Sequence, residues 1–176
     1  MSIEDLAIQA KKASIQLAGA DTKTKNRALA LIAESLKANR QMIVKANKKD
    51  LKNAEKVKLA KPLLKRLKFD EDKIDKVIAG IDSLIKLDDP VNRTQTATEL
   101  SEGLELYKVS CPIGVIGVIF ESRPDALVQI STLCLKSGNA VMLKGGSEAS
   151  NTNRILTDLI AEACRQAEIP DGWIQL

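Results

Sequence analysis

The 176-residue sequence contains no histidine, and this absence excludes several common kinds of site. A histidine general base, a Ser-His-Asp or Cys-His nucleophile pair, and every His-ligated zinc or haem centre are ruled out. Aromatic residues make up only 2% of the chain, so there is little material for stacking nucleic-acid bases, and aliphatic side chains must build the core. What is present, 44% hydrophobic and 28% charged residues, is typical of a globular chain rather than a disordered or fibrous one.

Cysteine is also scarce, and its three positions are widely spaced. An odd, scattered set predicts reduced thiols in a cytoplasmic protein, without disulfides. Cys134 and Cys164 lie in apolar helical patterns and are interpreted as core residues, whereas Cys111 precedes a proline with no base nearby. None is predicted to be catalytic. The first 17 residues contain scattered charges and no apolar run, so we expect neither a signal peptide nor a membrane partner.

The net charge of +4 conceals an asymmetry between the two halves of the chain. Residues 1–90 hold 20 Lys and Arg against 13 Asp and Glu, whereas residues 91–176 hold 7 against 10. The lysines recur along helical stretches with acids between them, which favours a solvated face over a nucleic-acid surface. A basic helical nucleic-acid binder is therefore the least favoured interpretation, and salt-dependent DNA affinity would distinguish it.

The pattern of residues 1–90 is helical. Apolar residues at intervals of three and four predict amphipathic helices over 3–17, from 22 or 24 to about 36, and from about 41 onward. Pro62 fits the first turn of a short helix, and Asp70 is a natural N-cap for a helix that ends before Asp88-Asp89-Pro90. We expect these residues to form a helical layer.

The period changes after residue 90. Alternating residues over 94–98 and 104–108 predict two short antiparallel strands. The continuous apolar run of 113–120 then predicts a central parallel strand that is covered on both faces.

Later segments alternate in type. Pro124 opens a predicted helix that runs to Lys136, a strand follows over 140–143, a helix begins near Ser150, and an incipient strand comes at 173–176.

This order predicts an α/β fold class, an N-terminal helical segment (1–90) followed by part of a Rossmann-like parallel sheet (91–176). The pattern indicates a sheet that stops partway, and its exposed edge makes a homo-oligomer plausible.

Two of the predicted strand ends carry unusual polar sequences, Glu121-Ser-Arg-Pro124 and Lys144-Gly-Gly-Ser-Glu148. Ligands of open parallel sheets bind beyond the carboxyl ends of the strands. The second segment combines a cation, two glycines, a hydroxyl and an acid before a helix, which suits phosphate or ribose groups.

Each segment also has a plainer interpretation. The order of a P-loop or of G-x-G-x-x-G is absent, so an ordinary glycine turn is about as well supported as a ligand site. Arg123 could hold a carboxylate or phosphate, but spacing alone slightly favours a surface ion pair with Glu121 or Asp125.

Three stretches carry a resemblance to a known family: Cys111 to Leu127, Leu135 to Ala149, and Asn153-Arg154. They resemble the gamma-glutamyl phosphate reductases, also called glutamate-5-semialdehyde dehydrogenases, of the aldehyde dehydrogenase superfamily. The helical residues 1–87 are similar to the family's N-terminal part. Bifunctional pyrroline-5-carboxylate synthase shares the Glu121 to Leu127 stretch and is an alternative parent that would need a preceding kinase domain.

The resemblance implies an oxidoreductase that uses NADPH to reduce L-glutamyl 5-phosphate in proline biosynthesis, with a cysteine thiolate as nucleophile. In the superfamily the lysine and the acid of a K-x-x-x-E stretch hold the adenosine ribose. The corresponding residues here are Lys144 and Glu148. Arg123 stands where superfamily dehydrogenases have an oxyanion-stabilising asparagine, so it is expected to orient the substrate's phosphate or carboxylate. The predicted cofactor-binding residues are Phe120, Glu121, Lys144, Gly145, Gly146, Ser147 and Glu148, and the predicted substrate-binding residues are Ser122, Arg123 and Asn139.

Length is the main departure from the family, whose members continue into a catalytic domain that bears the nucleophilic cysteine. We therefore expect an N-terminal part that is inactive alone, with no catalytic residue and no metal. A non-catalytic nucleotide- or partner-binding module is the alternative, and whether the gene ends at Leu176 would distinguish the two.

Overall fold

The first half of the chain is helical, as its periodicity predicts. The computed structural model describes residues 2–176, and its helices α1 to α5 span Ile3–Leu17, Thr22–Ala38, Arg40–Lys56, Lys61–Leu67 and Glu71–Lys86. Local signals fix several starts, because the side chains of Ser2, Asp21 and Asp70 each accept a backbone N–H from the first turn that follows. Pro62 lies in the first turn of α4, where its missing N–H leaves no intrahelical bond unmade.

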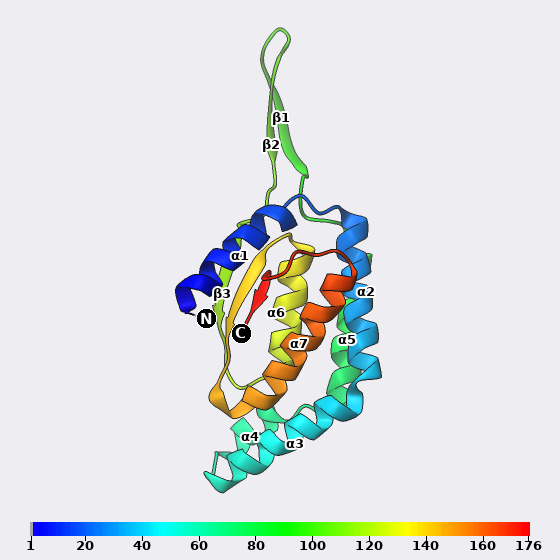
Figure 1. Cartoon of the computed structure of the whole chain (residues 1–176). Coiled ribbons are helices and arrows are strands. Elements are labelled where there is room, and N and C mark those ends of the chain that lie inside the picture. The colour runs from blue at the N-terminus through cyan, green and yellow to red at the C-terminus, as the bar shows by residue number, and fades with distance from the viewer. Residues whose placement is uncertain (1) are drawn as a thin grey trace.

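A hairpin of two antiparallel strands, β1 (Thr94–Ser101) and β2 (Leu104–Val109), follows the helices. The turn contains Gly103 at φ +76°, a conformation that glycine adopts without steric cost. Every residue of both strands is exposed, and the hairpin projects from one end of the body (Figure 1).

The remaining elements form a parallel α/β unit. Strands β3 (Val115–Ile119), β4 (Ala140–Lys144) and β5 (Ile174–Gln175) lie in the order β3-β4-β5, all parallel. Helix α6 (Pro124–Lys136) connects the first pair, and a 3-10 turn, η1 (Ser147–Ala149), with helix α7 (Ser150–Gln166) connects the second. The mixed fold, helices first and then a parallel sheet, confirms the predicted fold class.

The position predicted for the apolar run of 113–120 is wrong in one respect. Strand β3 lies at the edge of the described sheet and is half-exposed, with Ile119 at 87% exposure, whereas β4 is the central and most buried strand. An apolar run shows that a strand suits burial on both faces, but the elements that cover it are set by long-range packing.

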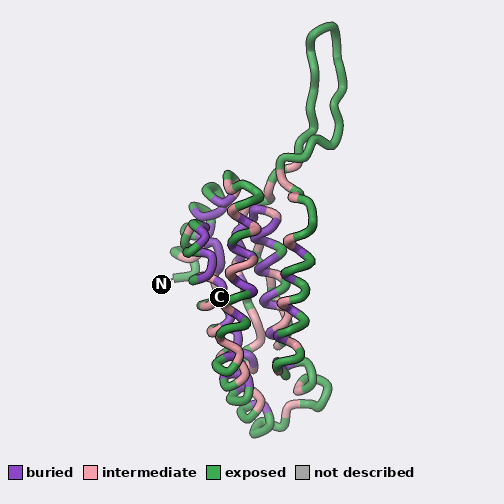
Figure 2. Tube along the Cα trace, turned by 90° about the vertical axis from the view of Figure 1, so that its right-hand side faces the viewer, coloured by how far each residue is buried: buried purple, intermediate pink, exposed green. Residues whose placement is uncertain are grey.

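One hydrophobic core joins the two halves of the chain. Helix α1 packs on one face of the sheet, α6 and α7 cover the other, and α2 and α5 pack outside them (Figure 1). Figure 2 shows the buried positions concentrated where these layers meet. Leu29 and Ile32 of α2 belong to the same cluster as Leu156 of α7 and Val141 of β4.

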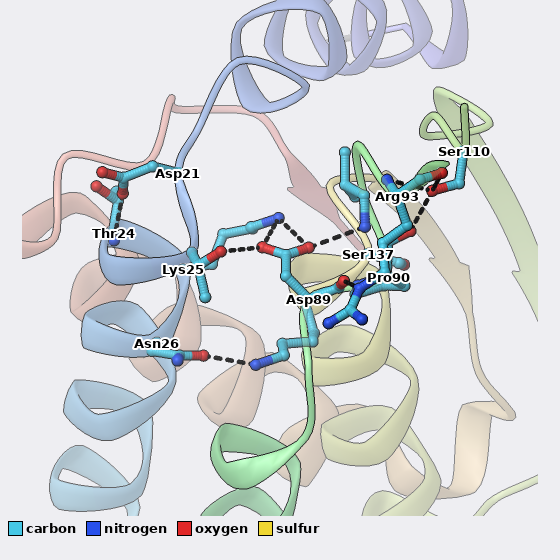
Figure 3. Close-up of polar contacts among 12 residues, drawn as sticks. Asp21, Thr24, Lys25, Asn26, Asp89, Pro90, Arg93, Ser110 and Ser137 are labelled. Carbon is cyan, nitrogen blue, oxygen red and sulfur yellow. Dashed lines mark hydrogen bonds and ion pairs between the residues drawn. The ribbon is translucent and has the colours of Figure 1, made fainter. Parts of the chain in front are cut away.

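An ion pair between the buried Lys25 and the partly buried Asp89 ties α2 to the segment before the hairpin (Figure 3). The Asp89 carboxylate accepts hydrogen bonds from Lys25 Nζ at 2.9 Å, Thr22 Oγ1 at 2.7 Å and the backbone N–H of Val91 at 3.0 Å. Arg93 Nε in turn donates to the Asp89 carbonyl at 2.7 Å. The base of the hairpin is therefore held by α2.

No helix within residues 2–176 has the length and apolar character that crossing a bilayer requires.

Candidate functional site

The two polar segments singled out in the sequence lie side by side at the carboxyl ends of β3 and β4. The Phe120 N–H donates to the Lys144 carbonyl at 3.1 Å and extends the pairing of the two strands to their ends. Helices α3 and α4 lie at this same end of the molecule, opposite the hairpin (Figure 1). The predicted edge-of-sheet location is thus where the chain brings these residues together.

Gly145 and Gly146 lie where the chain turns from β4 into η1, and neither position has room for a side chain. A Cβ atom at Gly145 would lie 2.5 Å from Asn153 Nδ2 and 3.0 Å from the Phe120 ring. At Gly146 it would collide with Ser122 Oγ and lie 2.7 Å from Glu148 Oε2. The glycines therefore let the loops after β3 and β4 approach each other, which an ordinary surface turn does not require.

Ser122 and Glu148 connect the two loops directly. Ser122 Oγ donates to Glu148 Oε2 at 2.5 Å, and this hydrogen bond is the main reason that the pKa of Glu148 lies below its ordinary value. Glu148 is therefore ionised at neutral pH. Both residues line a cavity of about 300 Å³ between this turn and α4. Leu63 and Arg66 of α4 form part of its wall, as does Leu59, which lies just before the helix. Glu121 also lines this cavity, and it accepts a hydrogen bond from Arg66 Nη1 at 2.6 Å.

Lys144 faces a different cavity, of about 230 Å³, on the side of β5 and α7. Its walls include Ser147, Asn153 and Arg154. Asn153 is 2% exposed, and its Oδ1 atom has no hydrogen-bond partner within the protein. Most buried acceptors in proteins have a hydrogen-bond partner, so this oxygen is an exception next to the cavity. Lys144 and Glu148 thus line two different cavities, and Gly146 lies in the wall of both.

Arg123 makes the surface contact that spacing alone favoured. Its Nη2 donates to Asp125 Oδ2 at 2.9 Å, and this hydrogen bond with the neighbouring charge raises the pKa of the guanidinium. The side chain is about half-exposed, beside Ser122 at the end of β3. An incoming anion would compete with Asp125 for it.

Asn139 is not brought to this site. It precedes β4, so about 16 Å of extended chain separates it from Lys144 at the other end of the strand. The side chain is buried, accepts from the Gly114 N–H at 2.8 Å and donates to the Ser137 carbonyl at 3.0 Å. These contacts brace the amino ends of β3 and β4, and its assignment to the substrate remains a prediction that the geometry does not favour.

The three thiols lie outside the two cavities. Cys134 and Cys164 are buried, and desolvation raises the pKa of Cys134 to about 11 and that of Cys164 still further. Both are therefore neutral thiols at physiological pH. Cys111 is exposed. Residues 2–176 contain no group of three or more acidic or cysteine side chains arranged to hold a metal ion.

Arg66 and Asn153 are site residues that local sequence reasoning missed. Arg66 reaches Glu121 across 55 positions in the sequence, and no periodicity signals such a contact. Asn153 was named only among the residues that carry the family resemblance and was not predicted to line a site. Its position in the first turn of a helix that follows two glycines is a signal that could have identified it.

The architecture defines a class of protein. An acetylating aldehyde dehydrogenase from Geobacillus thermoglucosidasius has the same fold at 12% identity, with a TM-score of 0.69 over 98% of this chain and 35% of its own. The chain therefore has the aldehyde dehydrogenase fold.

More similar proteins narrow this class. The gamma-glutamyl phosphate reductase of Thermotoga maritima superposes with a TM-score of 0.95 at 36% identity, covering 98% of this chain and 42% of that one. The gamma-glutamyl phosphate reductase of Acetivibrio thermocellus is 63% identical over all 176 residues, which make up 41% of its length. No family model matches the chain. The chain is thus similar throughout to gamma-glutamyl phosphate reductases, which confirms the resemblance, and it spans about two fifths of their length.

Proposed function

We propose that the chain forms the cofactor-binding part of an NADPH-dependent reductase that converts L-glutamyl 5-phosphate into L-glutamate 5-semialdehyde and phosphate in proline biosynthesis. The similarity to gamma-glutamyl phosphate reductases supports this proposal, as does the position of the Gly145–Gly146 turn at the carboxyl ends of parallel strands. Within it, residues 1–90 are a helical segment, residues 91–176 carry the cofactor region, and the location is cytoplasmic.

The observation that carries the proposal is the pair of cavities on either side of Gly146. Lys144, Gly145 and Ser147 would contact the adenosine end of the dinucleotide from one side, and Glu148 would accept a ribose hydroxyl from the other. Phe120 and Glu121 border the same turn. The two glycines, which have no side chains, fit a ligand that approaches the backbone closely. When bound, NADPH supplies the hydride that reduces the substrate's acyl carbon.

Substrate recognition is proposed at the end of β3. Ser122 offers a hydroxyl and Arg123 a half-exposed guanidinium, which pairs readily with a carboxylate or phosphate. Asn139 is retained in this role only as a prediction from resemblance.

The chain is further proposed to be inactive alone. Cys134 and Cys164 are buried and protonated, and none of the three cysteines lines either cavity. A thioester mechanism needs a thiolate at the substrate.

Titration of the 176-residue chain with NADPH, followed by nucleotide fluorescence, tests the proposed function. Saturable binding is expected, and Lys144→Ala should weaken it about tenfold or more, since one charge-assisted contact is worth about 1.5–3 kcal/mol. Lys12→Ala, which changes an exposed lysine on α1, is the matched control. Absence of saturable binding, or equal loss in both variants, would contradict the proposal.

A further inference from the structure

Helix α3 buries two polar side chains on the face that it turns toward the candidate site. Asn47 and Asp50 are 2% and 1% exposed and lie three positions apart, so they project from one side of the helix. A buried carboxylate is costly unless hydrogen bonds satisfy it, so the contacts of Asp50 indicate what it does.

Asp50 accepts four hydrogen bonds from the first turn of α7. Its Oδ2 accepts from the Thr152 N–H at 2.8 Å and from Thr152 Oγ1 at 2.6 Å. Its Oδ1 accepts from the Asn151 N–H at 3.2 Å and from Asn151 Nδ2 at 2.6 Å. The carboxylate is therefore satisfied by a single element about 100 residues away in the sequence.

This contact replaces a cap that α7 does not have. Its N-cap residue is Ala149, which has no side-chain acceptor, so the first N–H groups of the helix would otherwise lack partners. A carboxylate at a helix N-terminus is also favoured by the helix dipole. Because the cap comes from α3, the start of α7 and the Gly145–Ala149 turn just before it are fixed relative to α3.

Asn47 extends the same connection to α4. Its Nδ2 donates to the Leu67 carbonyl at 2.9 Å and to Thr152 Oγ1 at 3.3 Å, while its Oδ1 accepts from the Phe69 N–H at 2.7 Å. Leu67 follows Arg66, which pairs with Glu121 in the wall of the 300 Å³ cavity. Asn47 and Asp50 thus join the two walls of that cavity through one helix.

We propose that Asn47 and Asp50 are positioning residues that set the separation between α4 and the Gly145–Glu148 turn, and thereby the shape of the nucleotide site. The inference rests on the proposed function for its effect on binding. It has a further consequence: since Asp50 occupies the N–H groups of Asn151 and Thr152, these two groups do not hold a phosphate of the ligand.

The test uses Asp50→Asn in the full 176-residue chain, because the amide keeps the size of the side chain but loses one acceptor oxygen. In the ligand-free protein, the amide resonances of Gly145, Gly146 and Ser147 should shift and their hydrogen exchange should accelerate. The dissociation constant for NADPH should rise about tenfold, equivalent to about 1.4 kcal/mol. Thr152→Val, which removes one donor to Asp50 and keeps the side-chain volume, should produce the same changes to a smaller degree and serves if Asp50→Asn fails to fold.

Asn26→Ala is the matched control. Asn26 lies on α2, away from the site, and the substitution removes the side chain that accepts a hydrogen bond from Lys136 of α6. It should lower the melting temperature without moving the turn resonances or the NADPH affinity. Unchanged exchange and resonances of the turn in Asp50→Asn and Thr152→Val would overturn the inference, whether or not NADPH binds. If the turn resonances of the variants shift but their NADPH affinity stays at the wild-type value, the claim that Asn47 and Asp50 shape the nucleotide site is overturned. If the wild-type chain binds no NADPH but the turn resonances of the variants still shift, only the proposed function is contradicted.

Discussion

At the scale of single residues, hydrogen bonds from residues that are distant in sequence hold several side chains of the candidate site in place. Ser122 holds Glu148 from another loop, and Arg66 holds Glu121 from α4. Arg123 instead pairs with Asp125, two positions along, and is half-exposed. Because the guanidinium is half-exposed, a ligand can reach it and compete with Asp125 for its hydrogen bonds.

Arg123→Ala is therefore expected to reduce affinity for the two chemical halves of the substrate, L-glutamate and inorganic phosphate. Loss of one charge-assisted hydrogen bond corresponds to a decrease of about tenfold or more in affinity, measured by calorimetric titration. Arg165→Ala provides the control, since Arg165 also pairs with surface carboxylates but lies at the end of α7. Identical affinities in wild type and Arg123→Ala would show that Arg123 has only its surface ion pair.

The residue types of the site were predictable, but their partners were not. Glycines after a strand with a lysine before them predict a backbone that a ligand can approach, and this signal is local. The hydrogen bond between Ser122 and Glu148, the cap from Asp50 and the orphaned oxygen of Asn153 depend on how separate elements pack. The position of Asn139 was not predictable either, since its neighbours in sequence did not reveal that it lies at the other end of β4 from Lys144.

At the scale of secondary structure elements, the Lys25–Asp89 pair joins α2 to the base of the hairpin (Figure 3). Burial alone would raise the pKa of Asp89, but hydrogen bonds from Lys25, the Val91 N–H and Thr22 lower it below the ordinary value of 3.8. A carboxyl whose pKa is lowered on folding stabilises the protein above its unfolded pKa. That contribution is lost as pH falls through the folded value.

Asp89→Asn should consequently lower the free energy of unfolding by about 3 kcal/mol at pH 7, because it leaves the buried Lys25 ammonium without a charged partner. The difference between wild type and variant, from urea unfolding at several pH values, should shrink as pH falls below 3.8. Asp88→Asn removes a largely exposed pair with Arg93 and should cost less than about 1 kcal/mol. A difference that stays constant down to pH 2 would refute the assigned role of Asp89.

Elements were the most predictable level of the structure. The helix from Asp70, the hairpin and the helix opened by Pro124 follow from caps, alternation and proline placement, which are local signals. The edge position of β3 did not follow, since an apolar run carries no information about strand order.

At the scale of the whole molecule, the free edge of β3 is the feature that bears on association. Ile119 is 87% exposed on a strand with a neighbour on one side only within residues 2–176. Unpaired strand edges pair readily with other chains, so we predict that the chain self-associates through β3. Light scattering after size exclusion should show a dimer that Ile119→Lys abolishes. Leu106→Lys, at an exposed position of the hairpin, should leave it intact, and the opposite pattern would assign the contact to the hairpin.

The central claim is that the Gly145–Gly146 turn binds the nucleotide, and NADPH titration of the isotope-labelled 19.1 kDa chain followed by amide resonances tests it directly. We predict that resonances of Gly145, Gly146 and Ser122 shift together with one saturation curve. The cavity of about 330 Å³ between α5 and α6, lined by Val77, Leu84 and Leu133, should remain unperturbed. Shifts confined to that cavity, or no shifts at saturating NADPH, would contradict the claim.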